Sequence, residues 1–218
     1  MTFRAILFDI IGTTVVENNP NLINNCFENA FRENNVAITI DSIKVNRGKD
    51  KSEIIKKILH QLYYPASYAR PILDSFIKNL ENNLNNFYEN DGFREIIEHA
   101  KSRNIKIGLG TGLPKTFFER LFYNFGWEKI HFDYIKTAEE IGKSRPDPDM
   151  IFDMMRKFNI KNSEFLKVGD TISDICEGKN AKVFTAAILS GTQDKSEIMK
   201  ANPDFTISSL GNLKDIII

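Results

Sequence analysis

The stretch Ala-Ile-Leu-Phe-Asp-Ile-Ile-Gly-Thr-Thr, residues 5–14, decides the fold of this chain. Its first four residues (5–8) are all apolar, which predicts a short strand buried on both faces, as strands of parallel sheets are. Asp9 follows this strand directly, and Gly12 permits a sharp turn of the backbone. The stretch therefore predicts an aspartate at the carboxyl-terminal edge of a sheet.

The residues that follow this first strand predict helices rather than further strands. From about residue 21 to residue 84, apolar side chains recur at three- and four-residue spacing, as in Ile54 and Ile58. Pro65 and Pro71 divide the region into several helices. The strand at residues 5–8 must therefore find its partners beyond residue 104.

After Gly92 the sequence alternates between the two patterns. Helices are expected at 93–102, 115–125, 148–158, 172–180 and 194–200, and strands at 105–109, 132–135, 165–168, 183–188 and 204–207. Such alternation predicts right-handed crossovers and a parallel sheet. The predicted fold class is α/β: a Rossmann-like parallel sheet with helices on both faces, formed by residues 1–15 and 91–218. Residues 16–90 are predicted to be an inserted all-helical cap domain.

The composition excludes several classes of protein. Lys and Arg total 29, as do Asp and Glu, and no basic block is present, which argues against nucleic acid or an anionic membrane surface as a partner. No segment has the ~20 apolar residues of a membrane helix, and the first apolar run is too short for a signal sequence. We expect a soluble, cytoplasmic monomer or homodimer in which Cys26 and Cys176 are reduced thiols.

Two segments that end predicted strands could hold an oxyanion. In the first, Asp9 is exposed at the sheet edge, and Thr13 with the nearby backbone amides could bind the oxyanion. In the second, Gly110 and Gly112 would let backbone amides approach a phosphate, and the Thr111 hydroxyl could donate to it. The alternative for each segment is an ordinary turn that contains aspartate or glycine.

Two later segments could supply a cation and a metal site. Lys143 or Arg145 would direct a positive charge towards the same sheet edge, as transfer of a phosphoryl group requires. Asp170 follows a predicted strand and Asp174 lies about one helical turn further; such hard oxygen ligands suit Mg²⁺. The alternatives are a solvated basic turn and an acidic helix cap.

These four segments, in this order and with a helical insertion after the first, resemble the haloacid-dehalogenase-like hydrolases over nearly the whole chain. The resemblance implies that Asp9 is the nucleophile that forms an aspartyl-phosphate on a small phosphorylated or phosphonylated metabolite. It implies that Thr111 holds the phosphoryl oxygens and that Arg145 or Lys143 is the cation. Mg²⁺ would be bound by Asp170 and Asp174 together with Asp9 and the carbonyl of Ile11. The expected substrate contacts are Gly12, Thr13, Gly110, Gly112 and Arg47.

Within that superfamily, the segments 166–174 and 177–181 are very similar to the phosphonatase-like branch, which includes phosphonoacetaldehyde hydrolase. In phosphonatases a cap lysine three positions after a glycine forms a Schiff base with the aldehyde, and Lys51 follows Gly48 at that spacing. Arg47 and Lys49 could lower its pKa. Alternatively, the segment 50–53 is a capping box, and Lys51 is a solvated residue in the first turn of a helix.

Three positions depart from the patterns of these families. Most phosphatases of the superfamily have an acid–base aspartate two positions after the nucleophile, where this chain has Ile11. Phosphonatases also lack that aspartate, but they have histidine and methionine where this chain has Ile54 and Arg47. The alternatives are therefore phosphonoacetaldehyde hydrolase itself, or a degenerate member of the superfamily that only binds. A haloacid dehalogenase would lack Asp170, and receiver domains are shorter.

Overall fold

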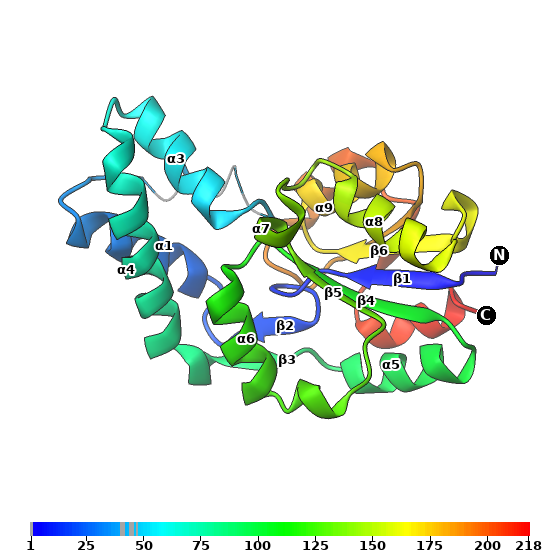
Figure 1. Ribbon diagram of the computed structural model, residues 1–218. Helices are drawn as coiled ribbons and strands as arrows, with labels where there is room; N and C mark the ends of the chain where they lie inside the picture. The colour runs from blue at the N-terminus through cyan, green and yellow to red at the C-terminus, as the bar shows by residue number, and fades with distance from the viewer. Residues whose placement is uncertain (1, 40–41, 44–45, 47) are drawn as a thin grey trace.

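The computed structural model describes residues 2–39, 42–43, 46 and 48–218, and it is built around one parallel sheet (Figure 1). The sheet has six strands in the order β5-β4-β1-β6-β7-β8. Their bounds are β1 Ala5–Phe8, β4 Lys106–Thr111, β5 Tyr134–Thr137, β6 Phe165–Gly169, β7 Phe184–Ile188 and β8 Phe205–Ile207. All five pairings are parallel, so every strand ends at the same edge. The predicted α/β fold class is confirmed.

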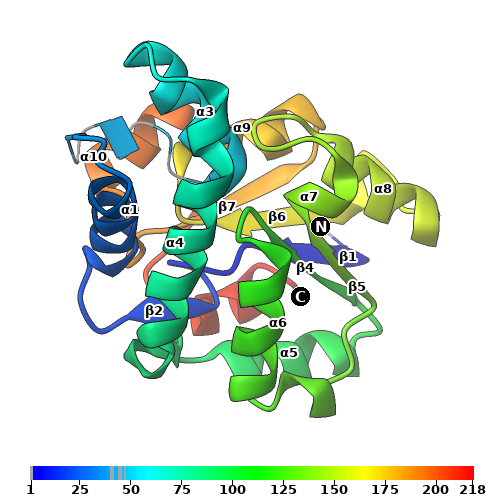
Figure 2. The ribbon, with the colours of Figure 1, turned by 60° about the vertical axis from the view of Figure 1, so that its left-hand side comes forward.

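Alternate side chains of β1 pack into layers on opposite faces of the sheet. Ile6 and Phe8 belong to the larger apolar cluster, and Ala5 and Leu7 belong to a second cluster. The first face is covered by α5 (Phe93–Ser102), α6 (Lys115–Asn124) and the 3-10 helix η6 (Leu210–Asp215). On the other side lie α7 (Ala138–Ile141), α8 (Asp149–Phe158), α9 (Ile172–Asn180) and α10 (Lys195–Ile198) (Figures 1 and 2). Strand β1 is thus buried on both faces, as its apolar sequence predicts.

The segment between β1 and α5 contains the helices α1 (Leu22–Glu33), α3 (Lys51–Gln61) and α4 (Ala69–Asn82), which lie beside the sheet edge (Figure 2). Helices α1 and α4 pack through Phe27 and Phe76, whose stacked rings have centroids 4.1 Å apart. Helix α3 begins after Asp50, whose carboxylate accepts a hydrogen bond from the amide of Glu53. These helices agree with the predicted periodicity.

The prediction that residues 16–90 are all helical is wrong at both ends. Strand β2 (Val15–Glu17) pairs antiparallel with β3 (Phe87–Glu89), and this ribbon joins the helices to the sheet (Figure 1). Strands of three residues are too short to show a twofold alternation of apolar side chains. The domain boundaries at residues 15 and 91 stay a prediction, and they lie next to the ribbon.

Other elements differ from the predicted bounds or were not predicted. Strand β4 extends to Thr111 and β5 is shifted to 134–137, and α7 and η6 have no predicted counterpart. The remaining 3-10 helices are η1 Ala66–Tyr68, η2 Leu84–Asn86, η3 Trp127–Lys129, η4 Asn162–Glu164 and η5 Met199–Ala201. Among the described residues, every helix is too short or too polar to span a lipid bilayer.

Candidate active site

The carboxyl ends of β1, β4 and β6 meet at one cavity. Strand β1 lies between the other two strands, so Asp9, Thr111 and Asp170, which end or follow these strands, are brought together. Together with the open space at its mouth, about 570 Å³ around this cavity is free of protein atoms. The loops of the sheet line one side of it, and the inserted helices line the other.

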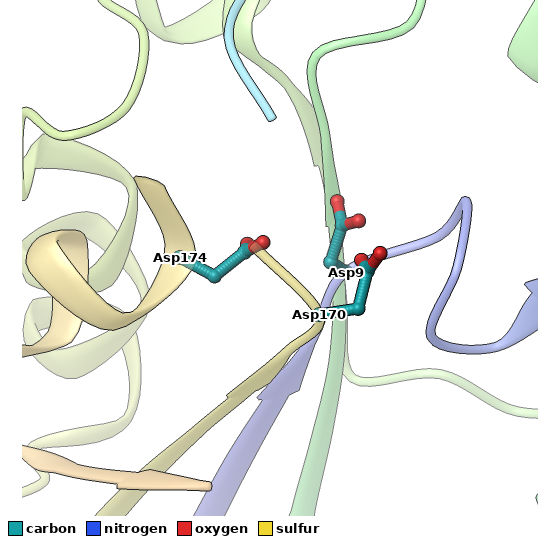
Figure 3. A group of neighbouring side chains, drawn as sticks. All are labelled: Asp9, Asp170 and Asp174. Atoms are coloured by element: carbon teal, nitrogen blue, oxygen red, sulfur yellow. The ribbon is translucent and has the colours of Figure 1, made fainter. Parts of the chain in front are cut away.

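Three buried carboxylates form a cluster beside this cavity. Asp9, Asp170 and Asp174 each offer an oxygen atom, and these oxygens lie within 4.8 Å of one another (Figure 3). Asp174 lies in the first turn of α9, where Thr171 donates a hydrogen bond of 2.5 Å to its Oδ2. The same threonine caps the helix by accepting from the amide of Asp174. The start of α9 thus fixes one carboxylate of the cluster.

Thr192 and Thr13 hold Asp170 in place. The backbone amide and hydroxyl of Thr192 donate to Asp170 Oδ2 at 2.7 and 2.5 Å, and Thr13 Oγ1 donates to Oδ1 at 3.3 Å. Burial, with the neighbouring charges of Asp9 and Asp174, raises the pKa of Asp170 to about 7. Burial also raises the pKa of Asp9. Three carboxylates at this spacing are therefore difficult to ionise together without a cation.

Arg145 supplies a buried cation to the cluster. Its Nη1 lies 2.6 Å from Asp9 Oδ1 and 3.1 Å from Asp174 Oδ1, and its Nη2 donates to the carbonyl of Gly110 at 2.7 Å. The three side chains are at most 7% exposed. Lys143, the alternative from the sequence, is turned to solvent, where it pairs with two aspartates at 3.4 and 2.9 Å. The structure thus places Arg145, and not Lys143, beside Asp9.

Sequence reasoning missed Lys167 and did not use Glu177. Lys167 is fully buried in β6, and its Nζ lies 3.0 Å from Asp174 Oδ1 and 3.2 Å from Glu177 Oε2. Glu177 Oε2 also lies 3.2 Å from Arg145 Nε. The available signal was a charged residue inside an otherwise apolar central strand, because an unpaired charge is almost never buried there.

The residues present fit a divalent cation. Four buried carboxylates lie at the site, those of Asp9, Asp170, Asp174 and Glu177. Only two cations, Arg145 and Lys167, pair with them among the described residues. With every carboxylate ionised these groups would carry a formal charge of −2, a state that the raised pKa values of Asp9 and Asp170 oppose unless a further cation is bound. All of the carboxylate donors are hard oxygens, as Mg²⁺ prefers. Asp9, Asp170 and Asp174 would hold the ion.

Lys51 faces the cavity rather than bulk solvent. It is partly buried, lines the cavity with Asp9 and Arg145, and its Nζ donates to the carbonyl of Lys49 at 3.1 Å. Burial lowers the pKa of Lys51; the charge of Asp9 opposes this effect, and Arg145 adds to it. Asp50 does cap α3 as the capping-box alternative predicts, but the lysine beside it is not a solvated residue.

The sequence alone predicts that Arg47 and Lys49, rather than burial, lower the pKa of Lys51. Lys49 Nζ lies 3.5 Å from Asn46 Oδ1. Arg47, also a predicted substrate contact, lies outside the described residues.

The other predicted contacts divide into cavity-lining and supporting residues. Ile11, Thr111 and Gly112 line the cavity. Gly12 and Gly110 have a packing role: a Cβ on Gly12 would lie 2.1 Å from Asp170 Oδ2, and one on Gly110 would lie 2.4 Å from Met150 Sδ. Gly12 also has a φ of +88°, which other residues rarely adopt. Both glycines therefore permit close packing behind the cavity.

The side of the cavity opposite Asp9 is mainly apolar. The inserted segment contributes Ile23, Phe27, Ile43 and Ile54, and Leu113 adds to this wall from the loop after β4. Its polar residues are Glu17, Asn24 and Lys51. A ligand here would present an anionic group to the sheet edge and a small, weakly polar group to the insertion.

Several known proteins resemble this chain in sequence. A family model described as haloacid dehalogenase-like hydrolase matches residues 6–188. The chain is 28% identical over 200 residues to phosphonoacetaldehyde hydrolase of Latilactobacillus sakei, covering 85% of this chain and 75% of that protein. It is 28% identical over 225 residues to pyrophosphatase PpaX of Oceanobacillus iheyensis, covering 100% and 96%.

Among solved structures, a phosphonoacetaldehyde hydrolase-like protein from Oleispira antarctica superposes with a TM-score of 0.84, covering 100% of this chain and 92% of that one. Its sequence is 17% identical, so this likeness concerns the fold.

Proposed function

Because the chain belongs to the haloacid dehalogenase-like hydrolases, we propose that it hydrolyses a small phosphate- or phosphonate-bearing metabolite with Asp9 as nucleophile and Mg²⁺ as cofactor. Its similarity to these relatives indicates a hydrolase of the phosphatase or phosphonatase type. The observation that supports the mechanism is the cluster of Asp9, Asp170 and Asp174, whose oxygens lie within 4.8 Å of one another.

In the proposed reaction a carboxylate oxygen of Asp9 attacks phosphorus. A phosphorus–oxygen bond to Asp9 forms, the bond to the leaving group breaks, and water then hydrolyses the aspartyl-phosphate. Arg145, at 2.6 Å from Asp9 Oδ1, would stabilise the charge on the equatorial oxygens. Bound Mg²⁺ would neutralise the carboxylates and allow an anionic phosphoryl group to approach them.

The leaving group decides which substrates are practical. Ile11, at the position of the usual acid, lines the cavity and has no proton to give. General acid catalysis typically contributes ~10²–10⁴-fold, so alkyl esters with poor leaving groups should react slowly. Substrates whose leaving group is stable without protonation are favoured.

Lys51 favours a second candidate, cleavage of a carbon–phosphorus bond next to a carbonyl. Its amine lines the same cavity, and burial lowers its pKa, which keeps more of it neutral and nucleophilic. Condensation with the substrate carbonyl would release water and give an imine. As an oxygen of Asp9 bonds to phosphorus and the carbon–phosphorus bond breaks, the electron pair of that bond would pass into an enamine. Protonation of the enamine at carbon would give an imine, and its hydrolysis would release the aldehyde and free Lys51.

A panel of three substrates tests these alternatives. Release of inorganic phosphate would be measured with p-nitrophenyl phosphate, phosphoglycolate and phosphonoacetaldehyde, with Mg²⁺ and then with EDTA. We expect Mg²⁺-dependent turnover of p-nitrophenyl phosphate, which needs no acid, and slow turnover of phosphoglycolate. Asp9→Asn should lower all rates by about 10³-fold or more. Absence of turnover in every case would favour a protein that only binds.

A further inference from the structure

Lys167 and Glu177 lie behind the catalytic cluster, and the proposed chemistry does not use them. Their side chains are 0% and 1% exposed, and neither lines the cavity. Lys167 comes from β6, next to the strand that ends at Asp9, and Glu177 comes from α9. Burial of two charged groups is costly before pairing is counted, so their presence here requires a reason.

The two side chains close a ring of alternating charges with Arg145 and Asp174. Glu177 Oε2 lies 3.2 Å from both Arg145 Nε and Lys167 Nζ. Asp174 Oδ1 lies 3.1 Å from Arg145 Nη1 and 3.0 Å from Lys167 Nζ. Each anion therefore contacts both cations, and each cation contacts both anions.

This ring fixes the orientation of the guanidinium group. Glu177 Oε2 forms an ion pair with Arg145 Nε at 3.2 Å, without hydrogen-bond geometry, and the carbonyl of Gly110 accepts a hydrogen bond from Nη2 at 2.7 Å. A planar group that is held at two of its three nitrogens cannot turn about its own axis. The third nitrogen, Nη1, is then directed at Asp9 Oδ1, 2.6 Å away.

Lys167 offsets part of the attraction that Asp174 and Glu177 exert on Arg145. It contacts the same oxygens of Asp174 and Glu177 that Arg145 contacts. Without this second cation, both carboxylates would draw Arg145 away from Asp9 towards the rear of the site. Lys167 thus shares the two anions and leaves Arg145 able to contact the nucleophile.

We propose that Glu177 and Lys167 are positioning residues that direct Arg145 towards the phosphoryl group attacked by Asp9. The proposal rests on the function given above, in which Arg145 stabilises the transferring group. It assigns to the buried pair a role in turnover in addition to any role in stability. Misplacement of a catalytic group by about 1 Å can cost 10²-fold in rate.

The competing explanation is that Lys167 and Glu177 only stabilise the fold. A double variant, Lys167→Met with Glu177→Gln, distinguishes this explanation from a positioning role. Lys167→Met leaves Asp174 and Glu177 to share Arg145 alone, and Glu177→Gln leaves Lys167 short of one anion, so each single variant should lose stability. The double variant removes one charge of each sign and keeps the net charge of the ring. Its stability should recover towards that of the wild type. Lys179→Met is the matched control, since Lys179 lies on the same helix and pairs with Asp204 outside the site.

The measurements are thermal unfolding, kcat and KM for p-nitrophenyl phosphate, and the Kd of inorganic phosphate by calorimetry in the presence of Mg²⁺. We expect kcat of Glu177→Gln and of the double variant to fall about 10- to 100-fold. The Kd of inorganic phosphate should rise several-fold in both, whereas Lys179→Met should leave both quantities unchanged. If the single variants do not fold, the double variant carries the test.

The outcomes separate this proposal from the proposed function. A double variant that recovers both stability and a kcat within about twofold of wild type would leave the pair a purely structural role. A wild-type protein without metal-dependent turnover would defeat the proposed function instead. In that case the Kd of inorganic phosphate still decides: equal affinity in wild type and double variant overturns the positioning role.

Discussion

Asp170 shows how one residue can make metal affinity depend on pH. Its pKa is raised to about 7 by burial and by two neighbouring carboxylates, so without a cation it is protonated over much of the physiological range. A carboxylate whose pKa is higher in the folded than in the unfolded protein favours the folded state at pH values below its unfolded pKa. That contribution to stability is lost as the pH rises to the folded pKa of about 7. Metal binding requires the ionised form, so the two effects have opposite signs.

We therefore expect Mg²⁺ to stabilise the protein more at pH 8 than at pH 6. The metal must displace a proton at the lower pH, which weakens apparent affinity by up to about tenfold per pH unit below the pKa. The measurement is the difference in melting temperature between 10 mM Mg²⁺ and EDTA, from about pH 5.5 to pH 8.5. Asp170→Asn should abolish the pH-dependent increment, and an equal effect of Mg²⁺ at all pH values in the wild type would contradict the expectation.

Lys51 allows a second prediction for a single residue. Lys51→Arg keeps a positive charge beside Asp9 but cannot form an imine, so it should abolish release of phosphate from phosphonoacetaldehyde. Turnover of p-nitrophenyl phosphate should fall less than about tenfold, because that ester needs no imine. Borohydride with the phosphonate should trap a covalent adduct, detected by mass spectrometry, in the wild type alone. An untrapped wild type that still releases phosphate from esters would eliminate the phosphonatase candidate.

Among the elements, the loop after β4 and the segment before α3 are in tight contact. The backbone amide of Lys51 donates to the carbonyl of Gly112 at 3.3 Å, and Gly48 accepts from Arg145 at 3.2 Å. Ser144 also donates to the carboxylate of Glu53. These contacts connect the insertion to the sheet loops at the cavity, so that both sides of the site are held together.

Gly112→Ala should separate these two elements. A Cβ at this position would lie 2.5 Å from the carbonyl oxygen of Lys49, and the backbone there must shift to admit it. We expect kcat/KM to fall by about tenfold or more with little change in stability, since the residues that must shift, Lys49 and Asp50, are only partly buried. Gly211→Ala, whose Cβ would meet Ser209 Oγ at 3.7 Å, is the control. Unchanged kinetics for Gly112→Ala would show that the contact is not needed.

The sequence predicts the elements that carry strong local patterns and misses those that depend on tertiary partners. Strand β1, with Asp9 at its end, follows from an uninterrupted apolar run, and α9 with Asp174 follows from the alternation of strand and helix patterns. Strands β2 and β3 were missed because three residues carry no readable period. Lys167 was missed because its burial makes sense only once Asp174 and Glu177 are known to lie beside it.

The sequence alone does not distinguish Lys143 from Arg145, because their orientation also depends on tertiary packing. Two basic residues two positions apart are equivalent in the sequence, and only the fold turns one inward. Thr192 gave no signal, because it contacts Asp170 from 22 residues further along the chain. Local sequence thus indicates which residue types are available, and long-range packing selects among them.

For the whole molecule, the inserted helices and the sheet share one apolar core. The larger cluster runs continuously from Phe27 and Phe76 of the insertion to Phe8, Phe93 and Trp127 beneath the sheet. A hydrophobic core that crosses a boundary between elements couples their unfolding. The chain therefore differs from two modules joined by a linker.

Unfolding in urea should accordingly be a single transition. Trp127 is the one tryptophan of the chain and is fully buried under the sheet, so its fluorescence reports the sheet domain, whereas far-ultraviolet circular dichroism reports all helices. We expect the two midpoints to coincide within error. An earlier loss of circular dichroism at unchanged fluorescence would show that the insertion unfolds by itself.

The β2–β3 ribbon has a consequence for how such proteins can diversify. Its register, with Val15 opposite Glu89 and Glu17 opposite Phe87, fixes the spacing at which the chain leaves the sheet and returns to it. Asn90 also donates to the carbonyls of Thr13 and Thr14, so the return point is tied to the turn after Asp9. A different set of helices grafted above this ribbon would inherit the same reactive centre, and selection could exchange recognition while leaving the chemistry in place.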